Sequence, residues 1–347
     1  MKHELLYQTQ AEFTAAQGNS GNVTSITPGV AYVLETNSVV GYNKRWDTLL
    51  AEYQVDDVSS STKIYNSASV KNKLKEIIVD KTHIPASAVT DTYQFTNPGL
   101  HIIRFRYSSL TAIPYDAFKN CGTLLCVKLP KTVTNIGHQA FAYCSILTGF
   151  THSTLCTYEY GFLEGSRKVK DVSVAIQGSM HNVFRGTGNP NNPGTLFVKG
   201  NWRDASGQGG FGDTNFERII IDGNMTSIIG VYTKNVKILK VTGNCSAGSD
   251  SFSMVYPVVP AFVEVLGNVT STQKMFRGGM IHFGYGEKIS ANPATIGIGA
   301  VSKVYVGDGS SQEHDQAILD KYLADESWAT YTNKLDLWYN YNGQYKE

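Results

Sequence analysis

The chain has 347 residues, which is enough for two or three compact domains or for one elongated domain. Its 30 Lys and Arg residues balance 29 Asp and Glu residues. The net charge of +1 therefore gives no electrostatic reason to expect nucleic acid or an anionic membrane as a partner. Charged residues make up only 17%, and the 33 glycines and 20 tyrosines favour strands, tight turns and a polar, uncharged surface.

The hydropathy pattern shows neither a targeting segment nor a membrane span. The first ten residues lack the apolar run that a secretory signal needs. The longest apolar stretch, residues 255–266, is interrupted by Pro257, Pro260 and Glu264, which excludes a transmembrane helix. We therefore expect a protein that stays where it is made, has lost its signal, or leaves the cell by lysis or assembly, without membrane insertion.

Residues 1–45 differ in pattern from the rest of the chain, and we interpret them as an anchoring leader. Residues 5–17 fit a short helix. Residues 21–42 alternate apolar and polar side chains around Pro28 and Gly29, which predicts a hairpin.

Residues 46–110 predict a small β-rich module. Its expected elements are a strand, an amphipathic turn and a pair of strands: residues 49–55, residues 74–78, and residues 92–95 with 101–107. Because the module leads directly into the first repeat, we expect it to cap the exposed end of a repeat array.

Two stretches that begin at Ile113 repeat with a period of 23 residues. Six apolar positions recur in the second copy: Ile113, Ala117, Phe118, Cys121, Leu124 and Val127 return as Ile136, Ala140, Phe141, Cys144, Leu147 and Phe150. A period of 20 to 29 residues with an L-x-x-L-x-L core is typical of a leucine-rich-repeat solenoid. Since one coil cannot bury its own apolar side, we expect stacked coils that share one core.

A second marker continues the register after residue 150. Gly-Asn dipeptides follow short alternating strands at residues 200–201, 223–224, 243–244 and 267–268. Glycine adopts a positive φ at low cost, as a corner between strand and turn requires. The fold class expected is therefore mainly β with short helices, with a solenoid of eight or nine coils over residues 111–311. Helical spacing over residues 312–347 predicts a C-terminal helical cap.

The five cysteines include no C-x-x-C pair, which argues against a disulfide framework and against a zinc site. Cys121 and Cys144 occupy the same position of successive repeats. We interpret both as small buried apolar residues, and a disulfide between them is the alternative.

Residues 113–147 closely resemble the BspA-like leucine-rich repeat, whose pattern is I-x-x-x-A-F-x-x-C-x-x-L-x-x-V-x-L-P. The match is specific over two repeats. Residues 304–308 and 328–331 resemble the closing repeat of these proteins. The resemblance implies a non-enzymatic surface protein of adhesin type that binds other molecules.

The leader carries a second resemblance. Residues 5–13 and 24–32 resemble the start of structural proteins of phages that infect gut Bacteroides. This implies a virion protein of fibre or decoration type, made in the host cytoplasm and held to other virion proteins by its leader. The alternative is an adhesin of the same repeat type on a bacterial cell surface.

No motif in the chain predicts catalysis, a cofactor or a metal. Residues 207–212 fit G-x-G-x-x-G, but they lie between short strands rather than in a βαβ unit, so we interpret them as a connecting loop. His138 and His152 are interpreted as surface or satisfied core residues. A β-helical carbohydrate-active enzyme, with carboxylates brought together from distant coils, remains a further alternative.

Aromatic residues near strand ends are the best candidates for a binding surface, because Tyr and Trp dominate binding hot spots. They are Tyr158, Tyr160, Trp202, Tyr232, Tyr256 and Tyr285. The alternative is that each packs between coils. Two polar insertions, residues 189–194 and 206–213, are expected to lie on one face and to bind. A host-surface glycan or protein is the expected partner, and a homo-oligomer stays open.

Overall fold

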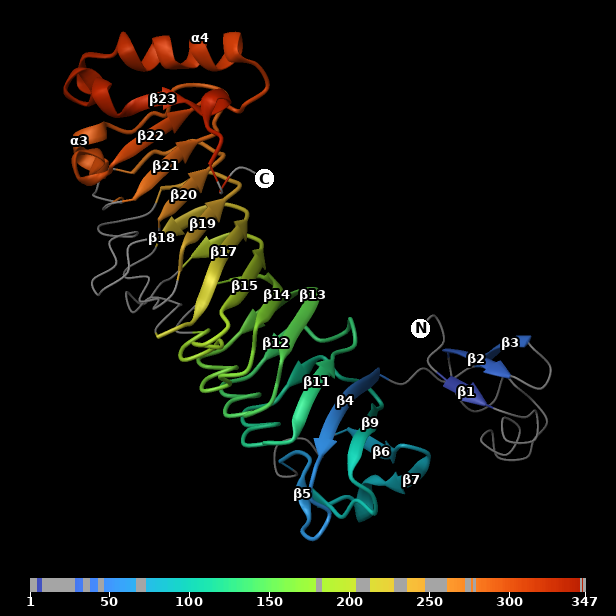
Figure 1. Ribbon diagram of the computed structural model, residues 1–347. Coiled ribbons are helices and arrows are strands. Elements are labelled where there is room, and N and C mark those ends of the chain that lie inside the picture. The colour runs from blue at the N-terminus through green and yellow to red at the C-terminus, as the bar shows by residue number, and fades with distance from the viewer. Residues whose placement is uncertain are drawn as a thin grey trace.

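The computed structural model describes an elongated stack of coils with an antiparallel module at one end and short helices at the other (Figure 1). The described residues are 5–7, 29–33, 38–42, 47–66, 73–178, 183–203, 213–227, 236–246, 261–271, 276, 279–343 and 345. Strands dominate these residues and helices are few and short. The mainly β, leucine-rich-repeat-like solenoid expected from the sequence is confirmed.

The central element is a parallel sheet in which spatial order follows chain order. Its strands are β10 (Ala112–Ile113), β12 (Asn135–Ile136), β13 (Gly149–Tyr158), β14 (Asp171–Ile176), β15 (Gly194–Lys199), β17 (Phe216–Asp222), β19 (Ile238–Val241), β20 (Phe262–Val265), β21 (Met280–Phe283), β22 (Lys303–Val306) and β23 (Leu335–Leu337). A second, shorter parallel pair joins β16 (Trp202–Arg203) to β18 (Met225–Ser227). Each coil thus adds one strand beside the strand of the preceding coil.

One continuous core runs through the stack. Along the sheet, inward side chains meet in register, as Leu196 meets Ile219 and Ile219 meets Leu239. In the first repeats, the Phe118 and Phe141 rings stack with centroids 5.2 Å apart and planes only 6° apart. The shared interior that the 23-residue period predicts is therefore present, because each coil buries the apolar side that its neighbour cannot cover alone.

The Gly-Asn dipeptides form two adjacent columns at one corner of the coils. The Oδ1 of Asn201 accepts a hydrogen bond from the backbone N–H of Asn224 at 3.0 Å. Asn224 accepts from Asn244 at 2.8 Å, and Asn244 from Asn268 at 2.9 Å. A ladder of side chain to backbone hydrogen bonds thus joins successive coils.

The glycine column is required by close approach of the backbone. A Cβ on Gly223 would lie 2.2 Å from the carbonyl oxygen of Gly200. One on Gly267 would lie 2.3 Å from the carbonyl carbon of Gly243. Coils stack at this corner only because these residues have no side chain.

An antiparallel sheet covers the open end of the first coil. Its order is β11-β4-β9-β6-β7, formed by β4 (Asp47–Val55), β6 (Leu74–Val79), β7 (Thr82–Pro85), β9 (Gly99–Tyr107) and β11 (Leu124–Lys128). Strand β11 belongs to the first repeat by sequence, yet it pairs with β4 of the module. Phe105 of β9 packs edge-on against Phe118 at 5.6 Å, so the module and the solenoid share the same core.

Two local predictions in this module are wrong. Residues 74–78 form part of strand β6 rather than an amphipathic turn, because the segment pairs with both β7 and β9. The expected pair of strands at 92–95 and 101–107 is also absent. β8 (Thr92–Tyr93) pairs with β5 (Thr62–Lys63), and the 3₁₀ turn η1 (Ala86–Ala88) precedes it. Strand β9 instead pairs with β4 over nine residues, and side chains such as Phe105 and Tyr107 are buried there.

In the leader, β1 (Leu5–Tyr7) pairs parallel with β2 (Gly29–Val33), and β2 pairs antiparallel with β3 (Ser38–Tyr42). The hairpin expected around Pro28 and Gly29 is thus replaced by an antiparallel pairing of residues 29–33 with residues 38–42. Residues 5–7 are a strand, against the helix expected over residues 5–17. The remaining residues of that expected helix lie outside the described residues.

Short helices follow the last coils. Within residues 312–347 they are α4 (Gln312–Leu323), η3 (Glu326–Lys334) and η4 (Trp338–Asn340), whereas α3 (Pro293–Ile296) and η2 (Ile298–Ala300) precede β22. The Ser311 side chain caps α4 by accepting from the N–H of His314. Tyr322 and Trp328 are fully buried against the end of the core. Within the described ranges, no helix has the length and apolar character to cross a membrane.

Cys121 and Cys144 are free, fully buried thiols on successive coils. The Cys144 thiol donates to the carbonyl oxygen of Phe118 at 3.2 Å. Burial raises the pKa of Cys144 to about 12. Both cysteines therefore act as core residues, and the alternative of a disulfide between them is wrong.

Candidate functional site

The structure divides the six aromatic candidates into three groups. Tyr158 and Trp202 are 2% and 0% exposed, so the expectation that they bind a partner is wrong. Tyr160 and Tyr285 are partly exposed, whereas Tyr232 and Tyr256 lie outside the described residues. The expected surface is thus reduced, among the described candidates, to Tyr160 and Tyr285.

Both buried residues belong to inward-facing columns. Tyr158 continues the column that Ile113 and Ile136 begin in the preceding coils. Trp202 begins another column, which Met225 continues in the next coil. Because neighbouring coils keep the same register, a large ring at either position is directed into the core.

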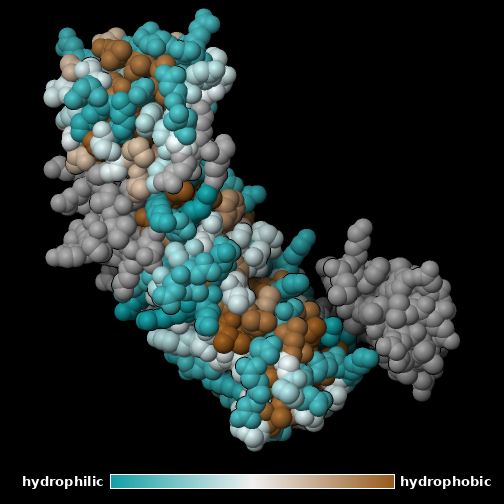
Figure 2. Space-filling view, viewed as in Figure 1, coloured by the Kyte–Doolittle hydropathy of each residue, from teal (hydrophilic) through white to brown (hydrophobic). Residues whose placement is uncertain are grey.

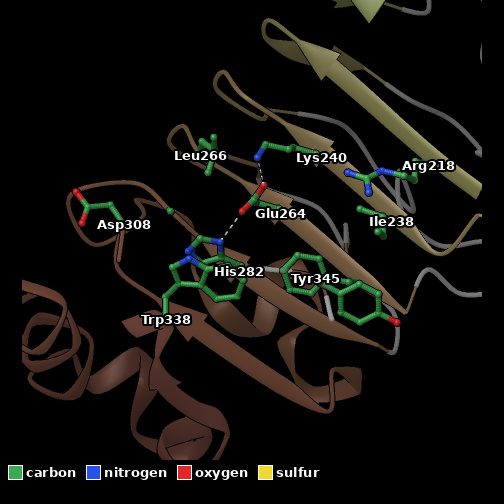
Figure 3. Close-up of a pocket in the computed structure, with 11 residues that line it drawn as sticks. Arg218, Ile238, Lys240, Glu264, Leu266, His282, Asp308, Trp338 and Tyr345 are labelled. Atoms are coloured by element: carbon green, nitrogen blue, oxygen red, sulfur yellow. Dashed lines mark hydrogen bonds and ion pairs between the residues drawn. The ribbon is translucent and has the colours of Figure 1, made fainter. Parts of the chain in front are cut away.

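One pocket of about 320 Å³ lies on the outer face of the sheet, near the C-terminal segment (Figure 3). Lys240, Glu264 and His282 stand side by side there on β19, β20 and β21. The Glu264 carboxylate is 2.6 Å from Lys240 Nζ and 2.9 Å from His282 Nδ1. Opposite charges on adjacent strands stabilise this part of the sheet.

The polar groups of this row are occupied by one another. Burial by itself raises the pKa of Glu264, but the hydrogen bonds from His282 and Lys240 outweigh burial and hold it below its ordinary value. His282 Nε2 lies 2.7 Å from the carbonyl oxygen of Gly307. Each ring nitrogen of His282 thus lies beside an oxygen atom of the protein itself.

Aromatic residues of the C-terminal segment cover the same face. The Trp338 ring stacks on His282 with centroids 3.8 Å apart, and Tyr345 stacks on Phe262 at 5.0 Å (Figure 3). Tyr341 lies parallel to Trp338 at 4.7 Å. These contacts hold the C-terminal segment on the sheet. We therefore interpret the pocket as part of the packing between this segment and the sheet, and not as a binding site.

A second candidate site lies in the turns that follow β10, β12 and β13. The rings of Tyr115, His138 and Tyr160 stack one per coil, with centroids 5.2 Å and 5.1 Å apart. The guanidinium of Arg185 continues the series 5.9 Å from the Tyr160 ring and donates a hydrogen bond to the Tyr160 hydroxyl. We call these four residues the ring row.

Polar side chains run beside the ring row and fix its position. Gln139 accepts a hydrogen bond from Lys119 Nζ at 2.6 Å and donates one to Glu164 at 2.6 Å. Glu164 in turn lies 3.9 Å from Arg185 Nε. These contacts link four successive turns, so the outward rings stand on a rigid support.

The ring row meets a pocket of about 290 Å³ to which both predicted insertions contribute. Pro190 of the 189–194 insertion and Asp213 of the 206–213 insertion line it, together with Tyr143. Asn189 shapes the first insertion by accepting from the N–H groups of Asn191 and Asn192. The G-x-G-x-x-G stretch at 207–212 lies outside the described residues.

Sequence reasoning missed the two most exposed rings of this surface. Tyr115 is 55% exposed and Tyr143 is 43% exposed. Both occupy unspecified positions of the repeat pattern, between its recurring apolar positions. Their positions in the turns could have indicated their exposure. Tyr115 lies three residues before the core residue Phe118, and Tyr143 lies two residues after the core residue Phe141.

The two histidines considered in the coils differ, because among the described residues the buried Nδ1 of His138 has no hydrogen-bond partner, whereas His152 has one. His138 stacks within the ring row, and His152 is buried with Nε2 2.9 Å from the carbonyl oxygen of Val133. Burial lowers the pKa of His152, although its hydrogen bond opposes the shift. In the part of the chain that the structure describes, no three His, Cys, Asp or Glu residues are grouped so that they would hold a metal ion.

Comparison with known families identifies the repeat type. Residues 62–187 match the family model described as BspA type leucine-rich repeat region, in six copies. The match covers about a third of the chain, beginning inside the antiparallel module and ending after β14. No curated protein and no solved structure is significantly similar to the chain. The chain thus contains BspA-type repeats, which present a repeated surface for binding or adhesion.

Proposed function

We propose that the chain is a non-enzymatic binding protein that contacts its partner through the ring row and the adjoining pocket. The observation that carries this proposal is the stacking of Tyr115, His138 and Tyr160, one ring per coil, beside the exposed Tyr143. Rings held in rigid turns lose little conformational freedom on binding. A repeated row of this kind supports contact with an extended partner.

The surface around the row favours contact and hydrogen bonding over long-range electrostatic attraction. The whole chain carries a net charge of only +1. Figure 2 shows hydrophilic residues over most of the visible described surface, with hydrophobic residues gathered in a few patches. A partner of low net charge with many hydroxyl or amide groups, such as a glycan or an uncharged protein surface, fits these properties.

Within this class we propose a phage virion component of fibre or decoration type, with residues 1–45 bound to other virion proteins. The support is the resemblance of residues 5–13 and 24–32 to phage structural proteins. The BspA-type repeats fit a bacterial cell-surface adhesin equally well, which makes the adhesin the second candidate.

Mass spectrometry of purified virions separates the two candidates. A virion component is present in particles at a fixed ratio to the major capsid protein, whereas an adhesin is absent from them and is found on intact cells by surface proteolysis. A chain that lacks residues 1–45 is expected to keep its circular dichroism spectrum and to be missing from the particles. Loss of the whole fold on this deletion contradicts the anchoring role.

Adherence of the full-length chain to host cells tests the binding surface itself. The double variant Tyr115→Ala, Tyr160→Ala is expected to adhere about tenfold less well, because it removes two rings of the row. Tyr339→Ala is the matched control, since it removes an exposed ring at the other end of the solenoid. Equal adherence of all three proteins overturns the role of the ring row.

A further inference from the structure

The pocket beside the ring row begins at a strained corner of the backbone. Asn120, Tyr143, Gly165 and Gly186 occupy the same corner of four successive coils with φ values of 62°, 57°, 70° and 63°. Glycine and asparagine adopt this left-handed conformation readily, whereas a bulky side chain does so rarely. Tyr143 is therefore the exceptional member of the column. Strain of this kind is concentrated at functional sites.

The corner glycine of the next coil makes room for the Tyr143 ring. A Cβ on Gly165 would lie 2.4 Å from Cδ1 and 2.6 Å from Cε1 of Tyr143. The ring therefore lies directly against the glycine backbone. Although one side of the ring packs against Gly165, Tyr143 is still 43% exposed.

The pocket exists because two successive corners carry no side chain. A Cβ on Gly186 would lie 3.4 Å from the backbone nitrogen of Gly165, so Gly186 follows directly in the column. Tyr143, Gly165 and Gly186 all line the cavity of about 290 Å³. This volume is near the lower end of the range for small-molecule sites, roughly 300–1,000 Å³.

The walls of the pocket carry charges of both signs in equal number. Glu164 and Asp213 supply two carboxylates, and Arg167 and Arg185 supply two guanidinium groups. Glu164 is held by Gln139 and Arg185, and Arg185 is held by the hydroxyl of Tyr160. The pocket thus offers fixed acceptors and fixed donors around one exposed ring, with no excess of charge.

We propose that this pocket binds a neutral pyranose residue of a glycan, placed against the Tyr143 ring. The C–H groups on one face of a pyranose are attracted by the negative face of an aromatic ring. Its hydroxyl groups donate to carboxylates and accept from guanidinium groups at the same time. Since the wall charges cancel, a charged ligand gains no net attraction. The inference rests on the proposed binding function and names its ligand class.

Saturation-transfer NMR of the full-length chain with simple sugars tests the site. The probes are the methyl glycosides of glucose, galactose, mannose and N-acetylglucosamine, with methyl glucuronide as the charged comparison. At least one neutral glycoside is expected to receive saturation from the protein, with the strongest transfer at ring C–H protons. Transfer to methyl glucuronide is expected to be weaker.

Tyr143→Asn is the decisive variant, because it copies the corner residue Asn120 of the preceding coil. It is expected to weaken glycoside binding about tenfold or more, while the unfolding midpoint stays the same or rises. Tyr143→Phe keeps the ring and is expected to bind within about twofold of the unaltered chain. Tyr339→Ala, which removes an exposed ring at the other end of the solenoid, is the matched control and is expected to bind normally.

Several results overturn the inference. Absence of transfer to every neutral glycoside, or unchanged binding by Tyr143→Asn, removes the site. Strongest transfer to methyl glucuronide removes the neutral ligand class. Host-cell adherence measured in parallel separates this failure from failure of the proposed function. Equal adherence of the unaltered chain and Tyr143→Asn overturns the sugar site alone, whereas absence of adherence by the unaltered chain overturns the binding function.

Discussion

Different interactions hold the coils in register in the two halves of the solenoid. In the first repeats, side chains stack in the core, as Phe118 does on Phe141. In the later coils, backbone contacts set the register through the glycine column and the asparagine ladder, for example between Asn224 and Asn244. The family match ends at residue 187, shortly before Gly200 and Asn201, where the glycine column and the asparagine ladder begin. Loss of a repeat pattern is therefore not loss of the repeat fold.

The two kinds of interaction differ in what a mutation removes. Stacked core rings depend on volume, so truncation leaves a cavity and loses buried apolar area. The glycine column depends on the absence of volume, so an added methyl group forces the coils apart. The asparagine ladder depends on single hydrogen bonds near solvent, which water partly replaces. We therefore expect mutations of these three kinds to differ in how much they lower the free energy of unfolding.

The largest effect is expected from Phe141→Ala in the first half. The ring is fully buried between coils, so truncation is expected to lower the free energy of unfolding by roughly 3–5 kcal/mol. Urea denaturation measures the change. Leu155→Ala removes an exposed apolar side chain of the neighbouring strand β13 and is expected to change stability by less than about 0.5 kcal/mol. Equal effects of the two variants would show that Phe141 does not face a shared core.

A smaller effect is expected from Gly267→Ala in the second half. The added Cβ would lie 2.3 Å from the backbone of Gly243, so the coils must shift, at a cost of about 1–3 kcal/mol. Gly286→Ala is the matched control, because nothing lies within 4 Å of a Cβ at that position. The same urea experiment compares the two variants. A stable Gly267→Ala protein contradicts the close approach of the two corners.

A still smaller effect is expected from Asn244→Ala. The variant loses the side-chain oxygen that accepts from the N–H of Asn268 and so interrupts the ladder. The free energy of unfolding is expected to fall by about 0.5–1.5 kcal/mol. Asn340→Ala, an exposed asparagine outside the ladder, serves as the control. If both variants unfold at the same urea concentration, the hydrogen bonds of the ladder do not stabilise the stacking of the coils.

The smallest effect is expected from acid titration of Glu264. Its pKa is lowered in the folded chain, so its ionised form stabilises the fold above the ordinary value of 4.5, and this contribution is lost as the pH falls through the lowered value. Unfolding of the wild-type chain and of Glu264→Gln is compared at pH 7 and at pH 3. The stability difference between the two proteins is expected to shrink at the lower pH. A difference that grows on acidification contradicts the pairing with Lys240 and His282.

The core of the repeats was predictable, whereas the surface that we propose for binding was predictable only in part. The 23-residue period correctly placed Phe118 and Phe141 inward, because recurrence at one coil position requires a shared environment. Pro190 and Asp213, which come from the two polar insertions, line the pocket. Neither pattern identified Tyr143, because its exposure depends on a glycine in the following coil.

The errors have a related cause. Tyr158 and Trp202 lie at strand ends, where alternation along a single strand gives no clear direction for a side chain. Their orientation follows instead from the columns that neighbouring coils impose, such as the pairing of Trp202 with Met225. The sequence of one strand does not show whether a side chain at its end is covered by the adjacent coil.

The sequence by itself determined the repeat period, the stacking of coils and the residues of the common core, because each of these is written within one period and then repeated. Only the tertiary structure decided which rings meet solvent and where a pocket opens. The exposure of Tyr143 depends on Gly165, and the walls beside it come from Arg185 and Asp213 in later coils. Contacts between residues one or more coils apart leave no local pattern in the chain, so they appear only when the coils are stacked.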